Sequence, residues 1–187
     1  KVVLDGKELK SLSGRALKTA RSKIAWIPQD LGLVPNLRVN QNIACGRASE
    51  KGFLGLMRSL LLMGSREKEE VADLLKRVGI KEKIFHRVDH LSGGQQQRVA
   101  IARALYQRPE MILADEPVSS VDPERAKSLV ELLIGLAREE GQTLVMSLHD
   151  IDLAKRYFDR VIGLREGQVV MDGAPDQIDL TQLYDLS

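Results

Sequence analysis

Two short apolar runs on either side of a helical segment place the strongest limit on how this chain folds. Met111 to Ala114 is a continuous apolar run of strand length, and Thr143 to Leu148 is a second, mostly apolar run. Such runs are typical of strands buried on both faces of a parallel sheet. Between them, Pro123 to Arg138 has a helical pattern, with Pro123 at the first helical position and Asp122 as its N-cap. The strand–helix–strand order predicts an α/β fold with a parallel sheet.

Residues 30–107 have a different pattern, most of which is helical. The clearest helix is Arg66 to Val78, in which apolar residues recur at helical spacing and Gly79 follows as a stop. We therefore predict an α/β core formed by residues 1–29 and 108–187, with a helical subdomain at 30–107. Shorter elements complete the prediction: strands at Val2–Leu4, Lys23–Pro28, Arg160–Leu164 and Gln168–Met171, and helices at Asn40–Ala48, Leu54–Leu62, Val99–Tyr106 and Ile151–Phe158.

Composition narrows the class of protein. The 187 residues are 43% hydrophobic and 29% charged, which indicates a globular domain with a buried core. A net charge of +2 and only 4% aromatic residues argue against a nucleic-acid-binding surface. Cys45 is the only cysteine, so no disulfide can form within the chain, and a reducing compartment is indicated. We expect Cys45 to be a small buried or half-buried residue and Trp26 to pack in the core.

The segment Leu91 to Arg98, LSGGQQQR, has the features of an anion-binding helix start. Ser92 is a good N-cap, and Gly93 and Gly94 let backbone N–H groups approach an anion closely. The N-terminus of a helix attracts phosphate through its free N–H groups and its dipole. An ordinary serine-capped helix is the better interpretation of Ser-Gly-Gly alone, but the full octapeptide favours phosphate binding.

A pair of carboxylates, Asp115 and Glu116, ends the first apolar run. In a parallel sheet this position is the carboxyl edge, where ligands bind in open α/β folds. Asp115 suits a Mg²⁺ site, and Glu116 suits a base that accepts a proton from an attacking water. The alternative is a strand that ends in a solvated acidic turn, which the run alone does not exclude.

Five motifs in order make the chain resemble the ATPase domains of ABC transporters. That resemblance implies the α/β fold of P-loop NTPases with a helical subdomain insertion. The motifs are a Q-loop at Ile27–Asp30, the signature at Leu91–Arg98, a Walker B strand at Ile112–Pro117, a D-loop at Ser119–Asp122 and a switch histidine within Ser147–Asp150.

The resemblance also implies a role for each matching residue. Gln29, Glu116 and His149 would be catalytic: Gln29 as a sensor of Mg²⁺, water and the membrane partner, Glu116 as general base, and His149 as a contact to the γ-phosphate. Asp115, with Gln29, would serve Mg²⁺. Nucleotide bound by the opposite subunit would be contacted by the signature residues Ser92, Gly93, Gly94 and Gln95, and Asp122 of the D-loop would couple the two sites.

One motif that P-loop NTPases need is not found in this chain. The sequence contains no G-x-x-x-x-G-K-[ST], the loop whose N–H groups and lysine hold the phosphates. In the family, an opening strand and turn like those of Lys1 to Leu9 follow that loop. We therefore expect the ATPase domain to be N-terminally incomplete here, lacking Walker A, and the isolated chain to hydrolyse ATP poorly or not at all.

The segment Gly52 to Glu70 lengthens the helical region, and together with the signature it resembles the ATP-binding subunit of bacterial phosphonate importers. This implies ATP and Mg²⁺ as cofactors, transmembrane permease subunits and a second ATPase subunit as partners, and a periplasmic solute-binding protein as an indirect one. The subunit would lie peripherally on the cytoplasmic face of the inner membrane. Two alternatives stay open: an ATPase for polar amino acids or lipoprotein release, and a non-catalytic module that acts by interaction only.

Overall fold

The computed structural model describes residues 3–4, 6–118 and 121–177 of the chain. It divides into two compact units, Lys1–Ser147 and Leu148–Ser187. The boundaries predicted at residues 30 and 107 lie inside the first unit and stay a prediction. None of the helices in the described ranges has the length and hydrophobicity that a membrane span requires.

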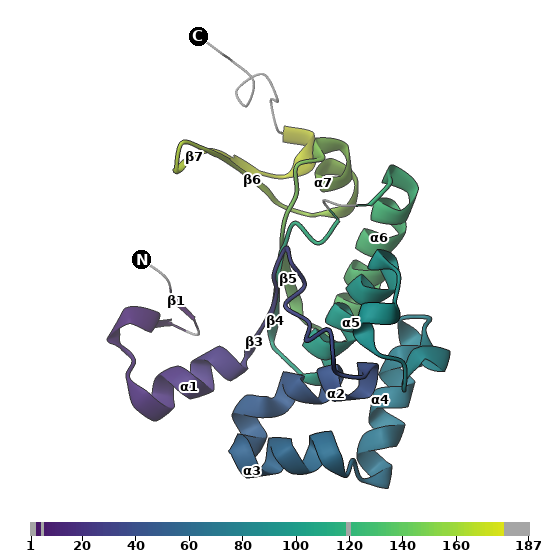
Figure 1. Cartoon of the computed structure of the whole chain (residues 1–187). Helices are drawn as coiled ribbons and strands as arrows, with labels where there is room; N and C mark the ends of the chain where they lie inside the picture. The colour runs from purple at the N-terminus through teal and green to yellow at the C-terminus, as the bar shows by residue number, and fades with distance from the viewer. Residues whose placement is uncertain (1–2, 5, 119–120, 178–187) are drawn as a thin grey trace. The chain divides into compact units, whose positions relative to one another are not determined.

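A parallel three-stranded sheet forms the centre of the first unit, as the sequence predicts. Its strands are β3 (Ile24–Ile27), β4 (Met111–Asp115) and β5 (Thr143–Ser147), in the order β3-β4-β5 (Figure 1). Ile27 pairs with Ala114, and Asp115 pairs with Ser147 at the carboxyl end of the sheet. The loops that follow β3 and β4 therefore begin at one edge.

The sheet is buried on one face, so the expectation of burial on both faces is wrong. Ala25 and Ile112 are fully buried on the side of helices α5 and α6, whereas Val145 of β5 is exposed on the other side. Trp26 also lies on the exposed side with 54% of its surface accessible, so its expected place in the core is wrong too. Strand residues alternate between faces, so helices packed on one face bury only every second residue.

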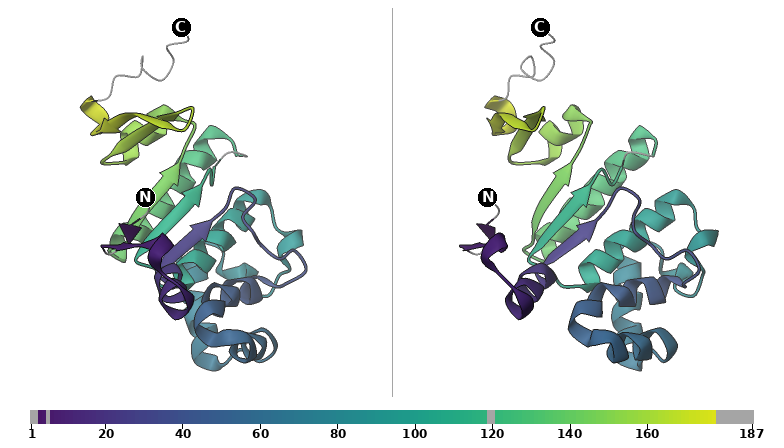
Figure 2. Two further views of the ribbon diagram at one scale, coloured as in Figure 1. Left: turned by 90° about the vertical axis from the view of Figure 1, so that its left-hand side faces the viewer. Right: turned by 60° about the vertical axis from the view of Figure 1, so that its left-hand side comes forward.

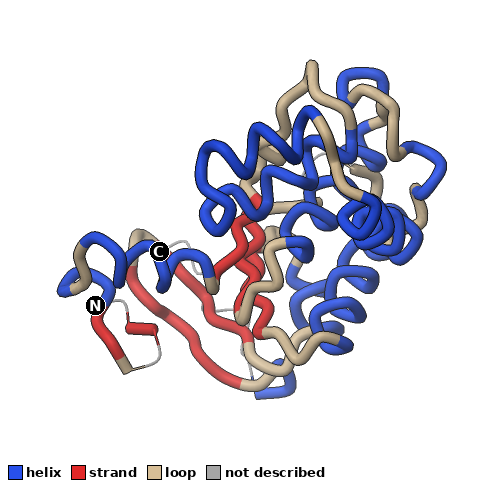
Figure 3. Tube along the Cα trace, turned by 90° about the horizontal axis from the view of Figure 1, so that it is seen from below, coloured by secondary structure: helices blue, strands red, loops and turns tan. Residues whose placement is uncertain are grey.

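The helical region runs from Val39 to Tyr106, and its helices gather to one side of the sheet (Figure 3). Helix α3 is longer than predicted and bends at Gly52, whose φ is 65°. The elements are α2 (Val39–Ala44), η2 (Cys45–Arg47), α3 (Ala48–Leu61), α4 (Ser65–Arg77), η3 (Lys81–Lys83), η4 (Val88–His90) and α5 (Gly93–Tyr106).

Among the remaining elements, α6, α7, β6 and β7 agree with the sequence prediction, whereas helix α1 was not predicted. The first unit opens with an antiparallel pair, and α6 begins at Pro123 with the Asp122 carboxylate as its N-cap, which confirms that prediction. In the second unit a helix precedes a hairpin. The elements are β1 (Val3–Leu4), β2 (Lys7–Glu8), η1 (Leu9–Ser11), α1 (Gly14–Ser22), α6 (Pro123–Glu139), α7 (Ile151–Tyr157), β6 (Val161–Arg165), β7 (Gln168–Gly173) and η5 (Pro175–Gln177).

Ion pairs around Tyr106 join η2 and α4 to α5. The buried Tyr106 hydroxyl donates to Glu67 Oε1 at 3.0 Å, and the Arg47 guanidinium lies 4.1 Å from the Tyr106 ring centroid. Arg47 and Arg108 both donate to Glu70, at 2.5 and 2.7 Å. Burial acts to raise the pKa of Glu70, but the hydrogen bonds from the two arginines outweigh it, and the pKa lies below its ordinary value. Glu70 therefore stays ionised and holds α4 in place.

Close backbone contact between η2 and α5 generates a stability prediction. A Cβ at Gly46 would lie 2.4 Å from the carbonyl oxygen of Arg103, so Gly46→Ala forces η2 away from α5. We expect a loss of about 1–3 kcal/mol in the free energy of unfolding, measured by chemical denaturation.

Gly135→Ala is the matched control, because Gly135 is exposed within α6 and a Cβ there meets nothing within 4 Å. Removing a mid-helix glycine should stabilise the chain by about 0.5–1 kcal/mol. Equal effects of the two substitutions would contradict the packing of η2 on α5.

Candidate functional site

The carboxyl edge of the sheet brings together three of the residues singled out from the sequence. Gln29, after β3, donates from Nε2 to Glu116 Oε2 at 3.2 Å. Ser147, the last residue of β5, donates from its hydroxyl to Asp115 Oδ1 at 2.8 Å and accepts from the Glu116 N–H at 2.9 Å. Gln29, Asp115 and Glu116 thus lie together at this edge. Ser147 joins them, although the sequence analysis gave it no role of its own.

Glu116 holds a backbone conformation that is rare for its type. Its φ is 44°, in the left-handed region that disfavours side chains with a Cβ. Such strain costs on the order of 1–3 kcal/mol and persists where the surrounding structure enforces it. Here the Ser147 hydroxyl fixes the Glu116 N–H. This backbone conformation turns the chain sharply after β4, and the Glu116 carboxylate then faces Gln29 across the strand ends.

The N-terminus of α5 is built as predicted. The Ser92 hydroxyl accepts from the Gln95 N–H at 3.4 Å, and Gln95 Oε1 accepts from the Ser92 N–H at 3.1 Å, so the two residues form a capping box. A Cβ added at Gly93 or Gly94 would meet nothing within 4 Å. The first turn of α5 is therefore open to a ligand, and its remaining N–H groups favour an anion.

A buried hydrogen bond connects α5 to the loop that carries Glu116. Gln97 is 7% exposed, and its Nε2 donates to the backbone oxygen of Pro117 at 2.8 Å. Nothing in the sequence separates Gln97 from Gln95 and Gln96, so only the fold identifies this contact. It couples the position of the loop after β4 to the helix that begins at Ser92.

Arg103, near the other end of α5, holds the loop that follows Gln29. It donates from Nη1 to the Gly32 oxygen at 2.5 Å and from Nη2 to the Leu31 oxygen at 2.7 Å. Leu31 and Gly32 both have positive φ, 62° and 53°. Burial lowers the pKa of the Arg103 guanidinium. These two charge-assisted hydrogen bonds, called the Arg103 fork below, compensate for the strained backbone at Leu31.

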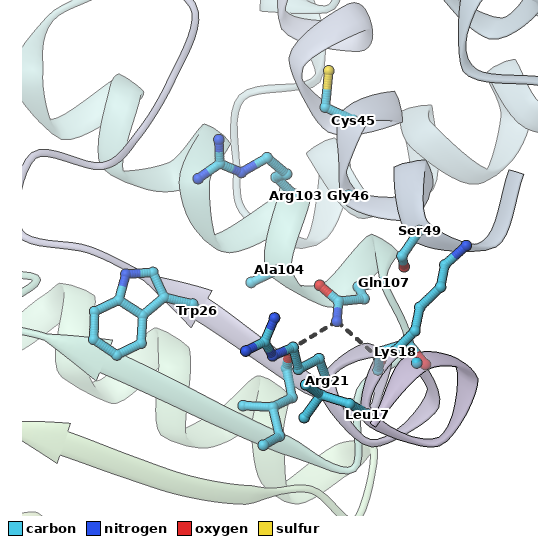
Figure 4. A pocket seen from close by; sticks show the side chains of 13 residues that line it. Leu17, Lys18, Arg21, Trp26, Cys45, Gly46, Ser49, Arg103, Ala104 and Gln107 are labelled. Carbon is cyan, nitrogen blue, oxygen red and sulfur yellow. Dashed lines mark hydrogen bonds between the residues drawn. The ribbon is translucent and has the colours of Figure 1, made fainter. Parts of the chain in front are cut away.

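A cavity of about 520 Å³ lies beside Arg103 and is lined by residues of α1, β3, η2, α3 and α5. Figure 4 shows Gln107 within it, and its amide donates to the backbone oxygens of Ser22 and Ile24 at 2.9 and 2.8 Å. Cys45 lines the same cavity, half-buried as expected, and burial raises the pKa of its thiol. The cavity is thus next to the contact that positions the loop after Gln29.

Two predicted site residues, Asp122 and His149, are not part of the hydrogen-bonded group of Gln29, Asp115, Glu116 and Ser147. Asp122 caps α6, where it accepts from the Arg125 N–H at 3.1 Å and pairs with Arg125 Nε at 3.2 Å. Ser119 and Ser120 of the predicted D-loop lie outside the described residues. His149 belongs to the second unit, and its predicted contact to the γ-phosphate stays a prediction.

The oxygen groups at the sheet edge suit one kind of metal. Across residues 3–4, 6–118 and 121–177, no three His, Cys, Asp or Glu side chains gather as a ready-made metal site. Asp115 presents a carboxylate oriented by Ser147, with Gln29 and Glu116 beside it. Mg²⁺ is commonly bound by one or two carboxylates together with water and substrate phosphates, so these residues fit that ion.

Comparison with known proteins adds sequence relatives. The family profile described as "ABC transporter" matches residues 1–119. The phosphonates import ATP-binding protein PhnC of Thiobacillus denitrificans is 43% identical over 97% of this chain and 68% of its own length. PhnC 2 of Trichodesmium erythraeum is 47% identical over 90% of this chain and 64% of its own length. PhnC 1 of a Nostoc species is 45% identical over 91% of this chain and 63% of its own length. The chain thus spans about two thirds of the length of these relatives.

Two solved structures share the fold. One is cbiO1 from Clostridium perfringens, described as part of the ABC transporter complex cbiONQ, with a TM-score of 0.78 and 29% identity over 94% of this chain and 66% of that one. The other is the ATP-binding cassette MJ0796 as a dimer bound to ADP and Pi. Its TM-score is 0.75, and it is 31% identical over 92% of this chain and 72% of that one. The fold is therefore that of an ABC ATPase domain, as the motifs predicted.

The Arg103 fork predicts a local effect on the loop after Gln29. In Arg103→Ala, two charge-assisted hydrogen bonds to strained backbone are lost, each worth about 1.5–3 kcal/mol. We expect amide hydrogen exchange at Leu31 to Val34 to speed up by at least tenfold, measured by mass spectrometry.

Arg98→Ala is the control on the same helix, because Arg98 donates to the Val78 oxygen at 2.7 Å, away from this loop. Arg98→Ala should lower the free energy of unfolding of the whole chain. It should not speed up amide exchange at Leu31 to Val34 beyond what that global loss of stability causes. Unchanged exchange in Arg103→Ala would show that the fork does not hold the loop.

Proposed function

The chain belongs to the ABC transporter family, and on that premise we propose that it is part of the ATP-hydrolysing subunit of a phosphonate importer. The observation that carries the catalytic part of this proposal is the hydrogen-bonded group of Gln29, Asp115, Glu116 and Ser147 at the carboxyl edge of the sheet. The substrate class rests on the relatives, each of which is named as a phosphonates import ATP-binding protein.

The proposed chemistry is attack of water on the γ-phosphorus of ATP. The Glu116 carboxylate accepts a proton from that water, the new P–O bond forms, and the bond to the bridging oxygen of ADP breaks. A Mg²⁺ ion held through Asp115 would neutralise phosphate charge during this step. Gln29, hydrogen-bonded to Glu116, reports the state of this site to the loop after β3. His149 is proposed to contact the γ-phosphate.

The N-terminus of α5 supplies half of a second phosphate site. Ser92, Gly93, Gly94 and Gln95 would offer N–H and hydroxyl groups to a nucleotide held by another ATPase subunit, with Asp122 coupling the two sites. The open space at Gly93 and Gly94 supports this arrangement. The MJ0796 cassette, which is similar to this chain, is described as a dimer bound to ADP and Pi.

The cavity beside Arg103 is the proposed docking site for a cytoplasmic helix of a transmembrane permease subunit. It is lined by Cys45, Gly46 and Ser49, and the Arg103 fork lies between it and the loop after Gln29. Docking there would act on that loop and thus on Gln29. This arrangement would place the subunit peripherally on the cytoplasmic face of the inner membrane.

A non-catalytic interaction module is the second candidate function. Such a module would offer its signature helix and the loop after β3 to a partner without hydrolysing ATP. The strained Glu116 and its contact with Gln29 favour the ATPase instead, because a module that only binds a partner gains nothing from that strain.

The role of Glu116 is tested in a polypeptide that places a phosphate-binding loop ahead of Lys1. Glu116→Gln should retain ATP binding and lower the rate of phosphate release by roughly 10²–10⁴-fold, because a positioned general base contributes about that factor. The readout is steady-state phosphate release with nucleotide affinity measured in parallel.

Glu110→Gln is its control, since Glu110 lies just before β4 and pairs with Lys23 at 2.9 Å. It should leave turnover near normal. Normal turnover in Glu116→Gln would remove Glu116 from the role of base and favour the interaction module for this site.

Docking is tested by crosslinking in a Cys45→Ser background. Ser49→Cys introduces a thiol in the cavity, and Ser128→Cys introduces one on the exposed face of α6. In membranes that contain the permease subunits, Ser49→Cys should crosslink to a permease and Ser128→Cys should not. A crosslink through Ser128→Cys with none through Ser49→Cys would place the docking surface elsewhere.

A further inference from the structure

Helix α3 presents an apolar face to solvent. Phe53, Leu54, Met57 and Leu61 are between 37% and 82% exposed, and Leu62, directly after the helix, is 76% exposed. At 3.6 residues per turn, the four helical side chains fall within an arc of about 100°. Figure 2 shows α3 at the outer edge of the helical region in both views. A contiguous face of this kind differs from the single apolar residues that ordinary surfaces expose, and it marks an interaction surface.

Polar contacts on the inward side of α3 hold the helix with this apolar face outward. Ser59 is 5% exposed, and Lys51 Nζ donates to its hydroxyl at 2.7 Å. Lys51 also pairs with Glu67 of α4, and Gln41 of α2 donates to the Leu60 oxygen at 2.9 Å. Turning the helix to bury Phe53 and Leu54 would break these contacts. The exposure of the apolar face is therefore fixed by the fold.

A basic cavity of about 490 Å³ lies alongside this face. Five basic and two acidic side chains line it, and both carboxylates are already neutralised: Glu67 by Lys51, and Glu70 by two arginines. Arg58 and Arg66 are exposed at this cavity. From Lys51 to Arg66 the sequence has no acidic residue. The cavity therefore has a net positive charge next to an apolar surface.

We propose that α3 rests on the surface of an anionic lipid bilayer. Phe53, Leu54, Met57 and Leu61 would enter the boundary between headgroups and acyl chains, as the apolar face of an interfacial helix does. Arg58 and Arg66 would contact lipid phosphates at the cavity, since basic side chains are attracted to anionic headgroups. The contact is peripheral and does not depend on ATP binding or hydrolysis.

The exposed side chains favour a bilayer over a protein partner. Between residues 53 and 62 they are five apolar groups and Arg58, with no other hydrogen-bonding group among them. Protein–protein interfaces carry about one hydrogen bond per 100–200 Å² and so need more directional groups. A bilayer surface requires only apolar area and positive charge.

The test is flotation of the 187-residue chain with vesicles of phosphatidylcholine, alone or mixed in equal parts with phosphatidylglycerol. We expect binding to the mixed vesicles and much weaker binding to phosphatidylcholine alone. Leu54→Gln with Leu61→Gln should weaken binding to mixed vesicles by roughly tenfold or more, because two apolar contacts are lost. Arg58→Glu should weaken it by about fivefold or more, since each basic side chain near such a surface contributes about fivefold.

Two matched variants control for composition. Phe85→Gln removes an exposed apolar side chain elsewhere in the helical region, and Lys76→Glu reverses an exposed charge on α4. Both should bind mixed vesicles like the unchanged chain, and thermal melting should show that all variants stay folded. The proposal is overturned if the Leu54 and Leu61 variant binds normally, if the control variants lose as much binding, or if that variant loses binding to detergent-solubilised permease while vesicle binding is unchanged.

Discussion

Helix α5 is the element on which the rest of the first unit depends. Its small buried residues, Ala100, Ala102 and Ala104, let neighbouring segments approach its backbone, and Gly46 of η2 sits so close to it that even a methyl group would not fit. Along its length, polar side chains then fix the surroundings: Gln97 holds the loop after β4, and Arg103 holds the loop after β3. Close packing brings these donors within reach of backbone oxygens in the two loops.

This arrangement explains how strained backbone can persist at the candidate site. Leu31 and Glu116 both have positive φ, and each lies in a loop that α5 holds through a side-chain hydrogen bond to a neighbouring carbonyl oxygen. Ser147 adds the third constraint by binding Asp115 and the Glu116 N–H together. A shift of α5 would therefore displace both loops through these hydrogen bonds. That coupling gives a physical route between a docked partner near η2 and the carboxylates at the sheet edge.

The elements were predictable where the deciding interactions are local. The N-caps Ser92 and Asp122 bond to N–H groups three residues away, and the strand and helix boundaries agree with the apolar pattern to within a few residues for β4 and α6. The exposure of Trp26 and of one face of β5 was not predictable in this way. An apolar run shows that a segment suits a strand, but whether a helix covers one face or both is decided by residues far away in the sequence.

The sequence by itself determined most of the strands and helices, the caps, and the placement of Asp115 and Glu116 at the carboxyl end of a parallel strand, because periodicity and motif spacing are properties of short segments. Only the tertiary structure decided which side chains hold that edge together. Arg103 reaches a carbonyl 72 residues away, Ser147 reaches a carboxylate 32 residues away, and Lys51 holds α3 with its apolar face outward through Glu67, 16 residues on. Such contacts depend on how whole elements pack, since a hydrogen bond requires two groups within about 3 Å and no local pattern specifies that distance.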